Sequence, residues 1–168
     1  RYLVKRLKKE SKRLRKMVEE TLELSKLEST ETFNKNKKIS ISDLIMESWQ
    51  TLKPLAEKKD IKINLFIPTK YYISGDIENL KRAFINILDN SIRYSPVNEE
   101  IQIEIFKRDS SVVIRVRDKG IGLEENESND IFSRFYRGDP SRTKFKKSGS
   151  GLGLSITKKI INNNKGFI

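Results

Sequence analysis

The chain has 168 residues and a formal net charge of +12 at pH 7, and it contains neither cysteine nor histidine. This composition excludes disulfides, thiolate or histidine metal sites and serine–histidine triads. A strongly basic chain is typical of proteins that bind nucleic acids or membrane surfaces. Here, however, the excess positive charge lies in residues 1–38 and 134–147, and the segment between them is nearly neutral.

The first predicted element is a long helix over residues 2–28. Apolar and small residues recur at alternating intervals of three and four, which is the heptad pattern of a helix that packs on a partner helix. This pattern runs through Val4, Leu7, Ser11, Leu14, Val18, Thr21 and Ser25. Its basic outer face favours a solvated flank over a lipid or nucleic-acid surface. The polar segment 29–38 then predicts a linker.

The next segment predicts one helix and two strands. Apolar residues at helical spacing predict a helix over residues 42–58. Pro54 lies inside it, where we expect a kink or a local irregularity. Residues 61–67 alternate between apolar and polar, which predicts a strand with one buried face, and residues 71–74 predict a shorter strand.

A second core helix is predicted over residues 76–95, with Asp76 as its N-cap and a proline directly after its end. Two alternating segments, 100–106 and 112–118, follow it and predict an antiparallel hairpin. Helices beside such a mixed sheet predict an α+β fold, a two-layer sandwich preceded by the long coiled-coil-like helix.

The C-terminal segment predicts a short helix over residues 129–137 and a last helix over residues 152–163. Residues 166–168 predict the start of another strand. No apolar run is long enough to cross a bilayer, and no signal peptide is present. Because the chain begins at Arg1 and not at methionine, we expect it to be a fragment or a processed product.

Glycine occupies every other position directly before the last predicted helix, in the sequence KSGSGLGLSI (residues 147–156). Such a turn is suited to binding phosphate, because free backbone N–H groups and the helix dipole both point at it. The Walker pattern is absent, and a dinucleotide fingerprint that starts at Gly149 would need glycine in place of Leu154. These two nucleotide-binding folds are therefore excluded. By itself the motif is equally consistent with a structural turn.

Asn86 and Asn90 are four residues apart and share one face of the second core helix. Asparagine is a poor residue for a helix interior and is costly to bury without partners. Arg93 and Tyr94 extend the same face by one turn, adding a cation and an aromatic ring. The set predicts either the polar wall of a cleft or a polar stripe on the surface.

A third motif, RDKGIGL, begins at the end of the last predicted strand. Asp118 can accept a hydrogen bond from an exocyclic amine. Gly120 and Gly122 allow the backbone to approach a flat ligand closely. A simple turn is again the alternative interpretation.

In this order and spacing, the three motifs resemble those of the ATP-binding domain of sensor histidine kinases, a Bergerat-type fold. The sequence IFSRFYR (131–137) resembles the phenylalanine box of that family. Residues 1–28 resemble the second helix of its dimerisation and histidine-phosphotransfer hairpin. The resemblance covers essentially the whole chain and implies three parts: this incomplete hairpin, a linker over 29–38, and a catalytic domain over 39–168 whose C-terminal strands are missing.

The resemblance also implies the roles of the site residues. Asn90 would ligate Mg²⁺ beside Asn86, and Asp118 would bind the adenine amine. Arg93 would approach the phosphates and Tyr94 would line the pocket, while the last glycines wrap the triphosphate. Residues 133–148 would form a flexible ATP lid anchored by Phe132 and Phe135. The other ATP-binding residues that it implies are Gly120, Gly122, Arg137, Gly149, Ser150, Gly151, Leu152, Gly153 and Leu154.

One position favours a kinase over a hydrolase. In the related ATPases of this fold, a glutamate four residues before the magnesium asparagine activates water. Here that position is Asn86, whose amide cannot take up a proton at neutral pH. The resemblance therefore implies slow hydrolysis and ATP retained for phosphoryl transfer.

The acceptor of that transfer is expected outside the chain, because the chain has no histidine. The resemblance places it on the first hairpin helix, which would precede Arg1, so no catalytic residue is assigned here. It implies relay to the receiver domain of a response regulator, a homodimer through a four-helix bundle, a cytoplasmic location and a membrane-anchored parent protein.

A catalytically silent module that binds nucleotide or acts as a scaffold is the alternative. A nucleic-acid binder is not expected. It would bind in a strongly salt-dependent manner and would ignore Mg-ATP. A test is to restore the missing hairpin helix and look for acid-labile phosphate. Its formation would indicate the kinase, and its absence would indicate the silent module.

Overall fold

The computed structural model describes residues 2–29, 37–124, 127–138 and 149–168. They belong to two compact units, one formed by residues 1–32 and 124–168 and the other by residues 33–123. Most of the predicted linker and the greater part of the predicted lid lie outside the described residues. The domain boundaries at residues 28 and 39 stay a prediction.

The unit of residues 33–123 contains a three-stranded mixed sheet. It consists of β2 (Lys62–Phe66), β4 (Glu100–Arg108) and β5 (Ser111–Arg117), in the order β2–β4–β5. Strand β2 runs parallel to β4, and β4 runs antiparallel to β5, which confirms the predicted hairpin. The alternating isoleucines of β4 all turn to one face and are buried, as a period of two requires.

A separate two-stranded antiparallel sheet pairs β1 (Lys37–Ser40) with β3 (Tyr72–Gly75). Strand β1 was not predicted, because its four residues continue the polar composition of the linker. Only Ile39 is buried in it, opposite Ile73 on the partner strand. This strand depends on a partner more than thirty residues away along the chain.

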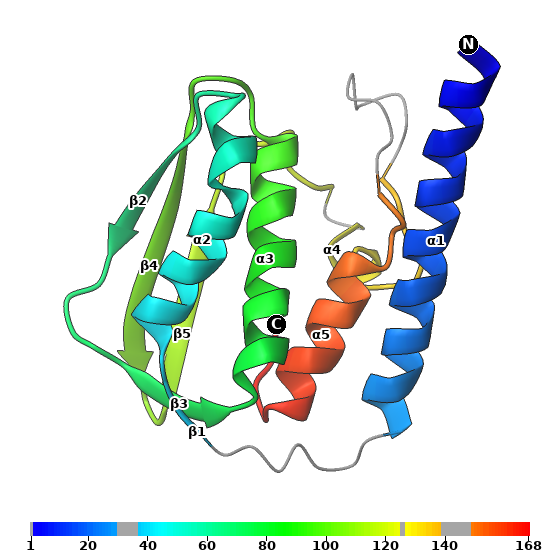
Figure 1. The fold of residues 1–168 in the computed structure, drawn as a ribbon. Coiled ribbons are helices and arrows are strands. Elements are labelled where there is room, and N and C mark those ends of the chain that lie inside the picture. Colours follow the sequence, from blue (N-terminus) through cyan, green and yellow to red (C-terminus); the bar gives the residue numbers. More distant parts are fainter. Residues whose placement is uncertain (1, 30–36, 125–126, 139–148) are drawn as a thin grey trace. The chain divides into compact units, whose positions relative to one another are not determined.

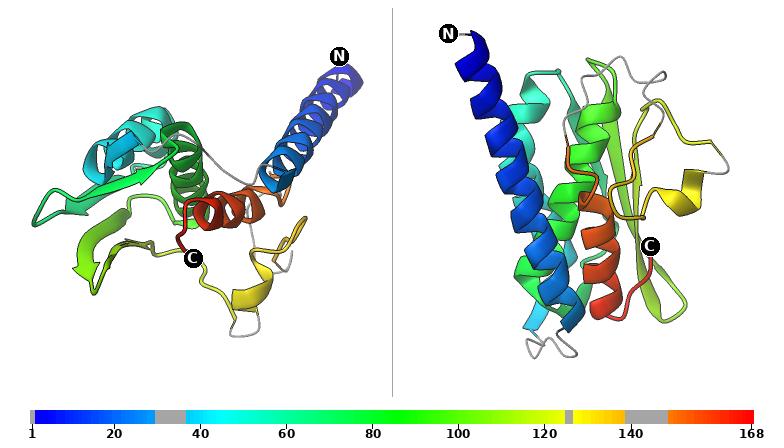
Figure 2. Two further views of the ribbon diagram at one scale, coloured as in Figure 1. Left: turned by 90° about the horizontal axis from the view of Figure 1, so that it is seen from below. Right: turned by 90° about the vertical axis from the view of Figure 1, so that its right-hand side faces the viewer.

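Two helices, α2 (Ile41–Glu57) and α3 (Ile77–Tyr94), pack together and cover one face of the mixed sheet (Figures 1 and 2). Both begin at side-chain caps. Ser40 accepts from the Asp43 N–H, and Asp76 accepts from the N–H groups of Glu78 and Asn79, which confirms the predicted N-cap. These helices over a mixed sheet confirm the predicted α+β class.

The core of this unit is aliphatic, with one tryptophan and one phenylalanine. Burial of such side chains is the main favourable contribution to folding, at about 25 cal/mol per Å² of apolar surface. Helix α2 runs unbroken through Pro54, which is exposed. The buried apolar residues of the two helices and β4 are Ile41, Leu44, Ile45, Trp49, Ala56, Leu80, Ala83, Phe84, Leu88, Ile92, Ile101, Ile103 and Ile105.

The other unit contains the long helix α1 (Tyr2–Ser29), the short helix α4 (Glu127–Asp130) and α5 (Gly153–Asn163). The C-terminal half of α1 lies beside α5 (Figures 1 and 2), where Leu24 and Leu27 are buried. The Asn163 side-chain amide donates a 2.9 Å hydrogen bond to the Leu27 carbonyl. Towards the N-terminus of α1, the predicted heptad face is exposed.

Two predictions for the C-terminal segment are wrong. The helix expected over residues 129–137 is a single turn, α4, followed by turns in which Phe135 has a φ of +60°. The helix already ends at Asp130, and the left-handed φ of Phe135 rules out a helix through that residue. Residues 166–168 form no strand. Among the described helices, none has the length and apolar character needed to cross a membrane.

Candidate nucleotide-binding site

Helix α3 presents the predicted asparagine wall beside the core. Leu88 and Ile92 are fully buried on its inner face, and Asn86 and Asn90 lie half-buried at the margin of that face. Four-residue spacing on an amphipathic helix places both amides along one line. These polar groups therefore border the apolar core in the way that a cleft wall would.

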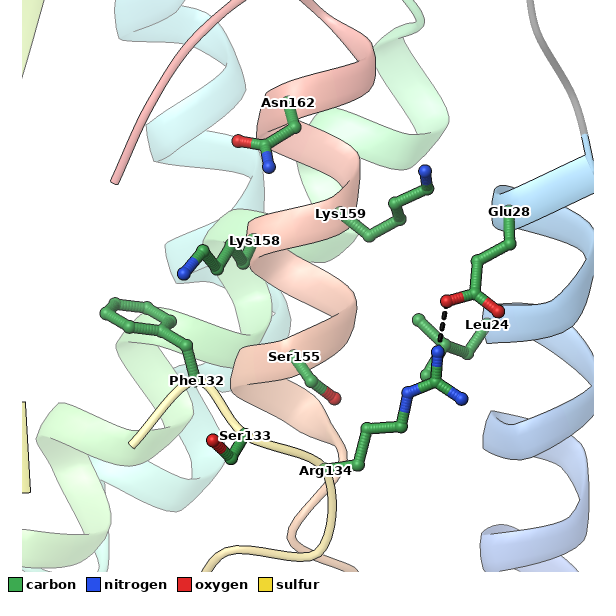
Figure 3. A pocket seen from close by; sticks show the side chains of 9 residues that line it. All are labelled: Leu24, Glu28, Phe132, Ser133, Arg134, Ser155, Lys158, Lys159 and Asn162. Atoms are coloured by element: carbon green, nitrogen blue, oxygen red, sulfur yellow. Dashed lines mark hydrogen bonds and ion pairs between the residues drawn. The ribbon is translucent and has the colours of Figure 1, made fainter. Parts of the chain in front are cut away.

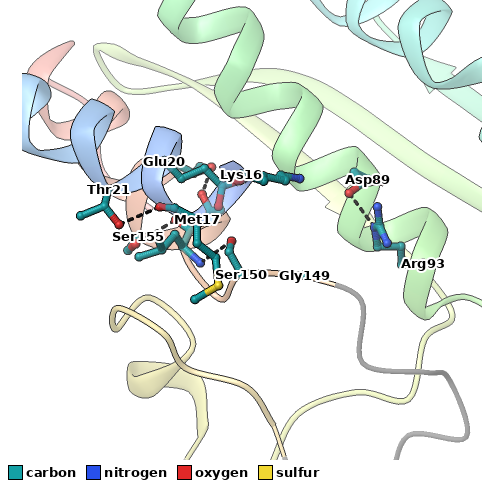
Figure 4. Close-up of polar contacts among 12 residues, drawn as sticks. Lys16, Met17, Glu20, Thr21, Asp89, Arg93, Gly149, Ser150 and Ser155 are labelled. Carbon is teal, nitrogen blue, oxygen red and sulfur yellow. Dashed lines mark hydrogen bonds and ion pairs between the residues drawn. The ribbon is translucent and has the colours of Figure 1, made fainter. Parts of the chain in front are cut away.

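Arg93 lies one turn further along α3, and its guanidinium Nε donates to the Asp89 carboxylate at 2.6 Å (Figure 4). The two residues form a favourable i, i+4 ion pair, which keeps the guanidinium alongside the helix. Asp89 is not among the predicted site residues. Two oppositely charged residues four apart are the signal that could have identified it.

The turn after β5 brings three predicted residues together at the end of α3. The Gly120 N–H donates a 2.9 Å hydrogen bond to the Asp118 Oδ1 atom. The carboxylate is therefore bound to the backbone of the turn that follows it. A Cβ atom at Gly120 would lie 2.8 Å from that oxygen and 3.3 Å from the Tyr94 carbonyl oxygen. A side chain at position 120 would therefore require the Asp118 carboxylate and the end of α3 to shift.

Gly122, two residues further along, has a φ of +70° in the left-handed region. Its surroundings are open, because no atom lies within 4 Å of a Cβ built there. Asp118 is exposed at the surface of its unit. Its carboxylate is thus fixed in orientation while remaining accessible to a ligand.

In the other unit, the glycine-rich segment packs against the phenylalanine-box turn. Gly151 has a φ of +80°, and the backbone of Phe135 and Tyr136 closes over it. The Arg137 guanidinium donates to the Gly149 carbonyl, which holds the two segments together from the other side. The structure thus brings together Phe135, Arg137 and the first two glycines, all of which the resemblance assigns to the ATP site.

The same segment leads directly into α5. The Leu152 N–H donates to the Ser150 Oγ atom at 3.2 Å, and the Leu152 side chain itself provides no cap. Gly153 begins the helix and Leu154 follows, half-buried. An N-terminus without a side-chain cap is suited to an anion, because its N–H groups and dipole favour negative charge.

The two predicted lid anchors differ in their surroundings. Phe132 is half-buried, and the Lys158 ammonium lies 5.3 Å from its ring centroid. These two residues line a pocket between α1 and α5, which is bordered by an ion pair of Glu28 with Arg134 (Figure 3). Phe135 is 53% exposed, and the contact that it makes with Gly151 is through its backbone.

The residue types present fit a magnesium nucleotide. Asp118 supplies an acceptor for an amine, and the Gly151 turn and the start of α5 supply backbone N–H groups for phosphate. Within the described residues, no cluster of three or more carboxylates could hold a metal ion alone. Magnesium usually retains water and binds through few protein oxygens together with phosphate, so this donor set fits a metal that arrives with the nucleotide.

The family of histidine kinase-, DNA gyrase B- and HSP90-like ATPases matches residues 75–168, more than half of the chain. Sensor-like histidine kinase SenX3 of Mycolicibacterium smegmatis is 34% identical over 159 residues, covering 95% of this chain and 41% of that protein. Sensor histidine kinase CusS of Escherichia coli is 32% identical over 156 residues, covering 93% of this chain and 32% of CusS.

Solved structures of sensor kinases share the fold. The mycobacterial sensor histidine kinase MprB matches with a TM-score of 0.65 and 26% identity, covering 77% of this chain and 80% of that chain. Histidine kinase AdeS of Acinetobacter baumannii matches with a TM-score of 0.75 over 97% of this chain and 74% of that chain. At 20% identity it shows the fold alone.

The chain therefore belongs to the family of histidine kinase-, DNA gyrase B- and HSP90-like ATPases. Within this family it carries the ATP-binding domain of the sensor histidine kinase type, as the resemblance implied. The chain spans between 32% and 41% of the length of the two curated relatives named above.

Proposed function

We propose that this chain binds Mg-ATP for a protein histidine kinase, which transfers the γ-phosphoryl group to a histidine. The arrangement of Asp118 is the observation that carries the proposal. One carboxylate oxygen is held by the Gly120 N–H, at a turn that packs on the end of α3. An exposed carboxylate oriented in this way can accept a hydrogen bond from the adenine amine.

Mg-ATP would be held by the residues that the resemblance assigns, with Asn90 as a magnesium ligand and Asn86 beside it. The glycine segment and the start of α5 would bind the phosphates through backbone N–H groups. When bound, the nucleotide and its metal supply the phosphoryl group and neutralise its charge. Phosphoryl transfer depends mainly on positioning and electrostatic stabilisation, which is what these residues provide.

Asn86 supports transfer over hydrolysis, because a neutral amide cannot act as a general base for water. The acceptor histidine must belong to another segment or another chain, since none of the 168 residues is histidine. We propose that the phosphoryl group then passes to an aspartate in the receiver domain of a response regulator. Its cytoplasmic location and the membrane attachment of the longer protein stay predictions.

The exposed apolar face of α1 supports dimerisation. Leu7, Leu14 and Val18 are each more than half exposed, although the heptad pattern predicts that they pack on another helix. We propose that this face belongs to a four-helix bundle once the preceding hairpin helix is present. Sedimentation of a chain extended by that helix tests this, and a strict monomer would contradict it.

Calorimetric titration with a non-hydrolysable ATP analogue and Mg²⁺ tests the nucleotide site directly. The unaltered chain is expected to bind, and Asp118→Ala is expected to abolish binding. Asp43→Ala is the matched control, because Asp43 is also an exposed aspartate, on α2. Absence of binding by the folded, unaltered chain would contradict the proposal.

The transfer step needs a second experiment. A polypeptide that carries the first hairpin helix with its histidine is mixed with the chain and ATP labelled at the γ-phosphate. Acid-labile, alkali-stable label on that polypeptide is expected. Binding without any such label would favour the silent nucleotide-binding module instead.

A further inference from the structure

Lys59, in the turn after α2, binds the C-terminal end of α3. Its ammonium Nζ donates three hydrogen bonds to backbone carbonyls, at 2.9 Å to Ile92, 2.7 Å to Arg93 and 2.8 Å to Ser95. A lysine ammonium has three protons to donate, so this one side chain uses its full donor capacity on one helix end. Nothing in the polar sequence EKKD indicates this role.

The last carbonyls of a helix lack partners within the helix, and a cation at that end also interacts favourably with the helix dipole. Lys59 meets both needs at α3. Its backbone contributes as well, because the Lys59 carbonyl accepts a 2.8 Å hydrogen bond from the Asn98 N–H. Lys59 therefore contacts the segment between α3 and β4 twice. Its ammonium binds the start of the segment, and its backbone carbonyl binds the segment near its end.

The helix end that Lys59 binds is the part of α3 that faces the Asp118 turn. Between the two carbonyls of Arg93 and Ser95 lies the Tyr94 carbonyl, whose oxygen would be in tight contact, at 3.3 Å, with a Cβ atom on Gly120. Gly120 in turn holds the Asp118 carboxylate. A continuous series of close contacts thus runs from the Lys59 ammonium to the Asp118 carboxylate, entirely within one compact unit.

We propose that Lys59 is a positioning residue of the nucleotide site: it fixes the end of α3, and through the Tyr94 carbonyl and Gly120 it sets the position of the Asp118 carboxylate. The proposal rests on the function proposed above. Lys59 itself is not expected to touch the nucleotide. It acts by preventing the end of α3 from fraying into the space beside the turn.

The environment of Lys59 differs from that of Lys81 on α3. Burial lowers the pKa of Lys59 from its usual value, and the nearby Arg93 guanidinium lowers it further. Lys81, on the surface of α3, instead pairs with Glu47 at 2.9 Å, and this hydrogen bond raises the pKa of Lys81. A cation that is partly buried among carbonyls indicates a structural task, because desolvating it would otherwise be unfavourable.

The test compares three variants of the full chain: Lys59→Met, Lys59→Gln and the control Lys81→Met. Affinity for the non-hydrolysable ATP analogue is measured by calorimetry. The Gly120 amide is followed by nuclear magnetic resonance. Lys59→Met is expected to weaken binding about tenfold, the scale of a lost charge-assisted contact, and to shift the Gly120 signal. Lys81→Met should change neither.

Ile101→Val serves as the control for stability, since it removes one methylene from a fully buried site on β4 and is expected to destabilise the unit moderately. If general destabilisation explained the result, this variant would also bind weakly. Should Lys59→Met fail to fold, Lys59→Gln supplies the measurement, because it retains N–H donors while it loses the charge and one of the three donor hydrogens. We expect it to bind more weakly than the unaltered chain.

A folded Lys59→Met or Lys59→Gln chain with unaltered affinity and an unshifted Gly120 signal would overturn the proposal. Failure of the proposed function looks different, since the unaltered chain itself would then not bind. In that case the Gly120 signal still tests whether Lys59 positions the turn. An unshifted signal in the folded variants would overturn that part too.

Discussion

Gly151 lies against the backbone of Phe135: a Cβ atom at Gly151 would come 2.8 Å from the Phe135 carbonyl carbon and 2.9 Å from its Cα atom. Gly151 also has a φ of +80°, which disfavours any L side chain. Gly151→Ala is therefore expected to destabilise the chain by about 2 kcal/mol from the backbone strain, or by more if Phe135 cannot shift. Urea denaturation measures this.

Gly149→Ala provides the comparison for stability. Among the described residues apart from its chain neighbours, no atom lies within 4 Å of a Cβ at Gly149, and no left-handed φ is found there. The free energy of unfolding is expected to change by less than about 0.5 kcal/mol. Equal destabilisation by the two substitutions would show that the contact with Phe135 is unimportant.

Asn90→Ala is expected to remove the magnesium dependence of nucleotide binding. The side-chain oxygen of Asn90 is the predicted protein ligand, and magnesium held by few protein oxygens is sensitive to the loss of one. Calorimetry with and without Mg²⁺ checks the prediction. Asn64→Ala, on the exposed face of β2, is the control. Retained magnesium dependence in Asn90→Ala would exclude this ligand.

Leu24→Ala is expected to lower the free energy of unfolding by about 2–4 kcal/mol, because it would leave a cavity where α1 packs beside α5. Leu24 is 4% exposed, whereas Leu14, on the same helix, is 62% exposed. Leu14→Ala should therefore cost less than about 0.5 kcal/mol in the monomeric chain. Similar costs for both would mean that α1 does not pack on α5 in solution.

Tyr136 provides a prediction for alkaline pH. Its phenol donates a 2.9 Å hydrogen bond to Glu127, and this bond, followed by burial and the Glu127 charge, raises the pKa of Tyr136 above its usual value of 10.0. The contact therefore stabilises the folded chain below pH 10.0, and this stabilisation is lost as the pH rises through the higher folded-state value. Absorbance titration of the tyrosinate follows it.

Glu127→Gln is the control for that titration, because it removes the charge while keeping an acceptor. One of the five tyrosines should then ionise at a lower pH than in the unaltered chain. Tyr136→Phe should remove the same late step altogether. Identical titration curves for the unaltered chain and Glu127→Gln would show that the contact does not form in solution.

The sequence predicted most of the regular structure because the decisive signals are local. Alternation over residues 100–117 identified the β4–β5 hairpin, and Asp76 identified the start of α3. Strand β1 was missed because it depends on β3, a partner distant in sequence. The helix expected over residues 129–137 failed because the backbone at Phe135 turns left-handed, which no periodicity reveals.

The order and spacing of the asparagine, aspartate and glycine motifs, read by themselves from the sequence, determined the family and the residues of the candidate site. Motifs of this kind are local, and their chemistry follows from residue type. Only the tertiary structure decided which groups hold those residues in place: Lys59 on the end of α3, Gly120 beneath Asp118, and Phe135 over Gly151. Such contacts depend on where separate segments meet, and that is fixed by packing and by the pairing of backbone groups.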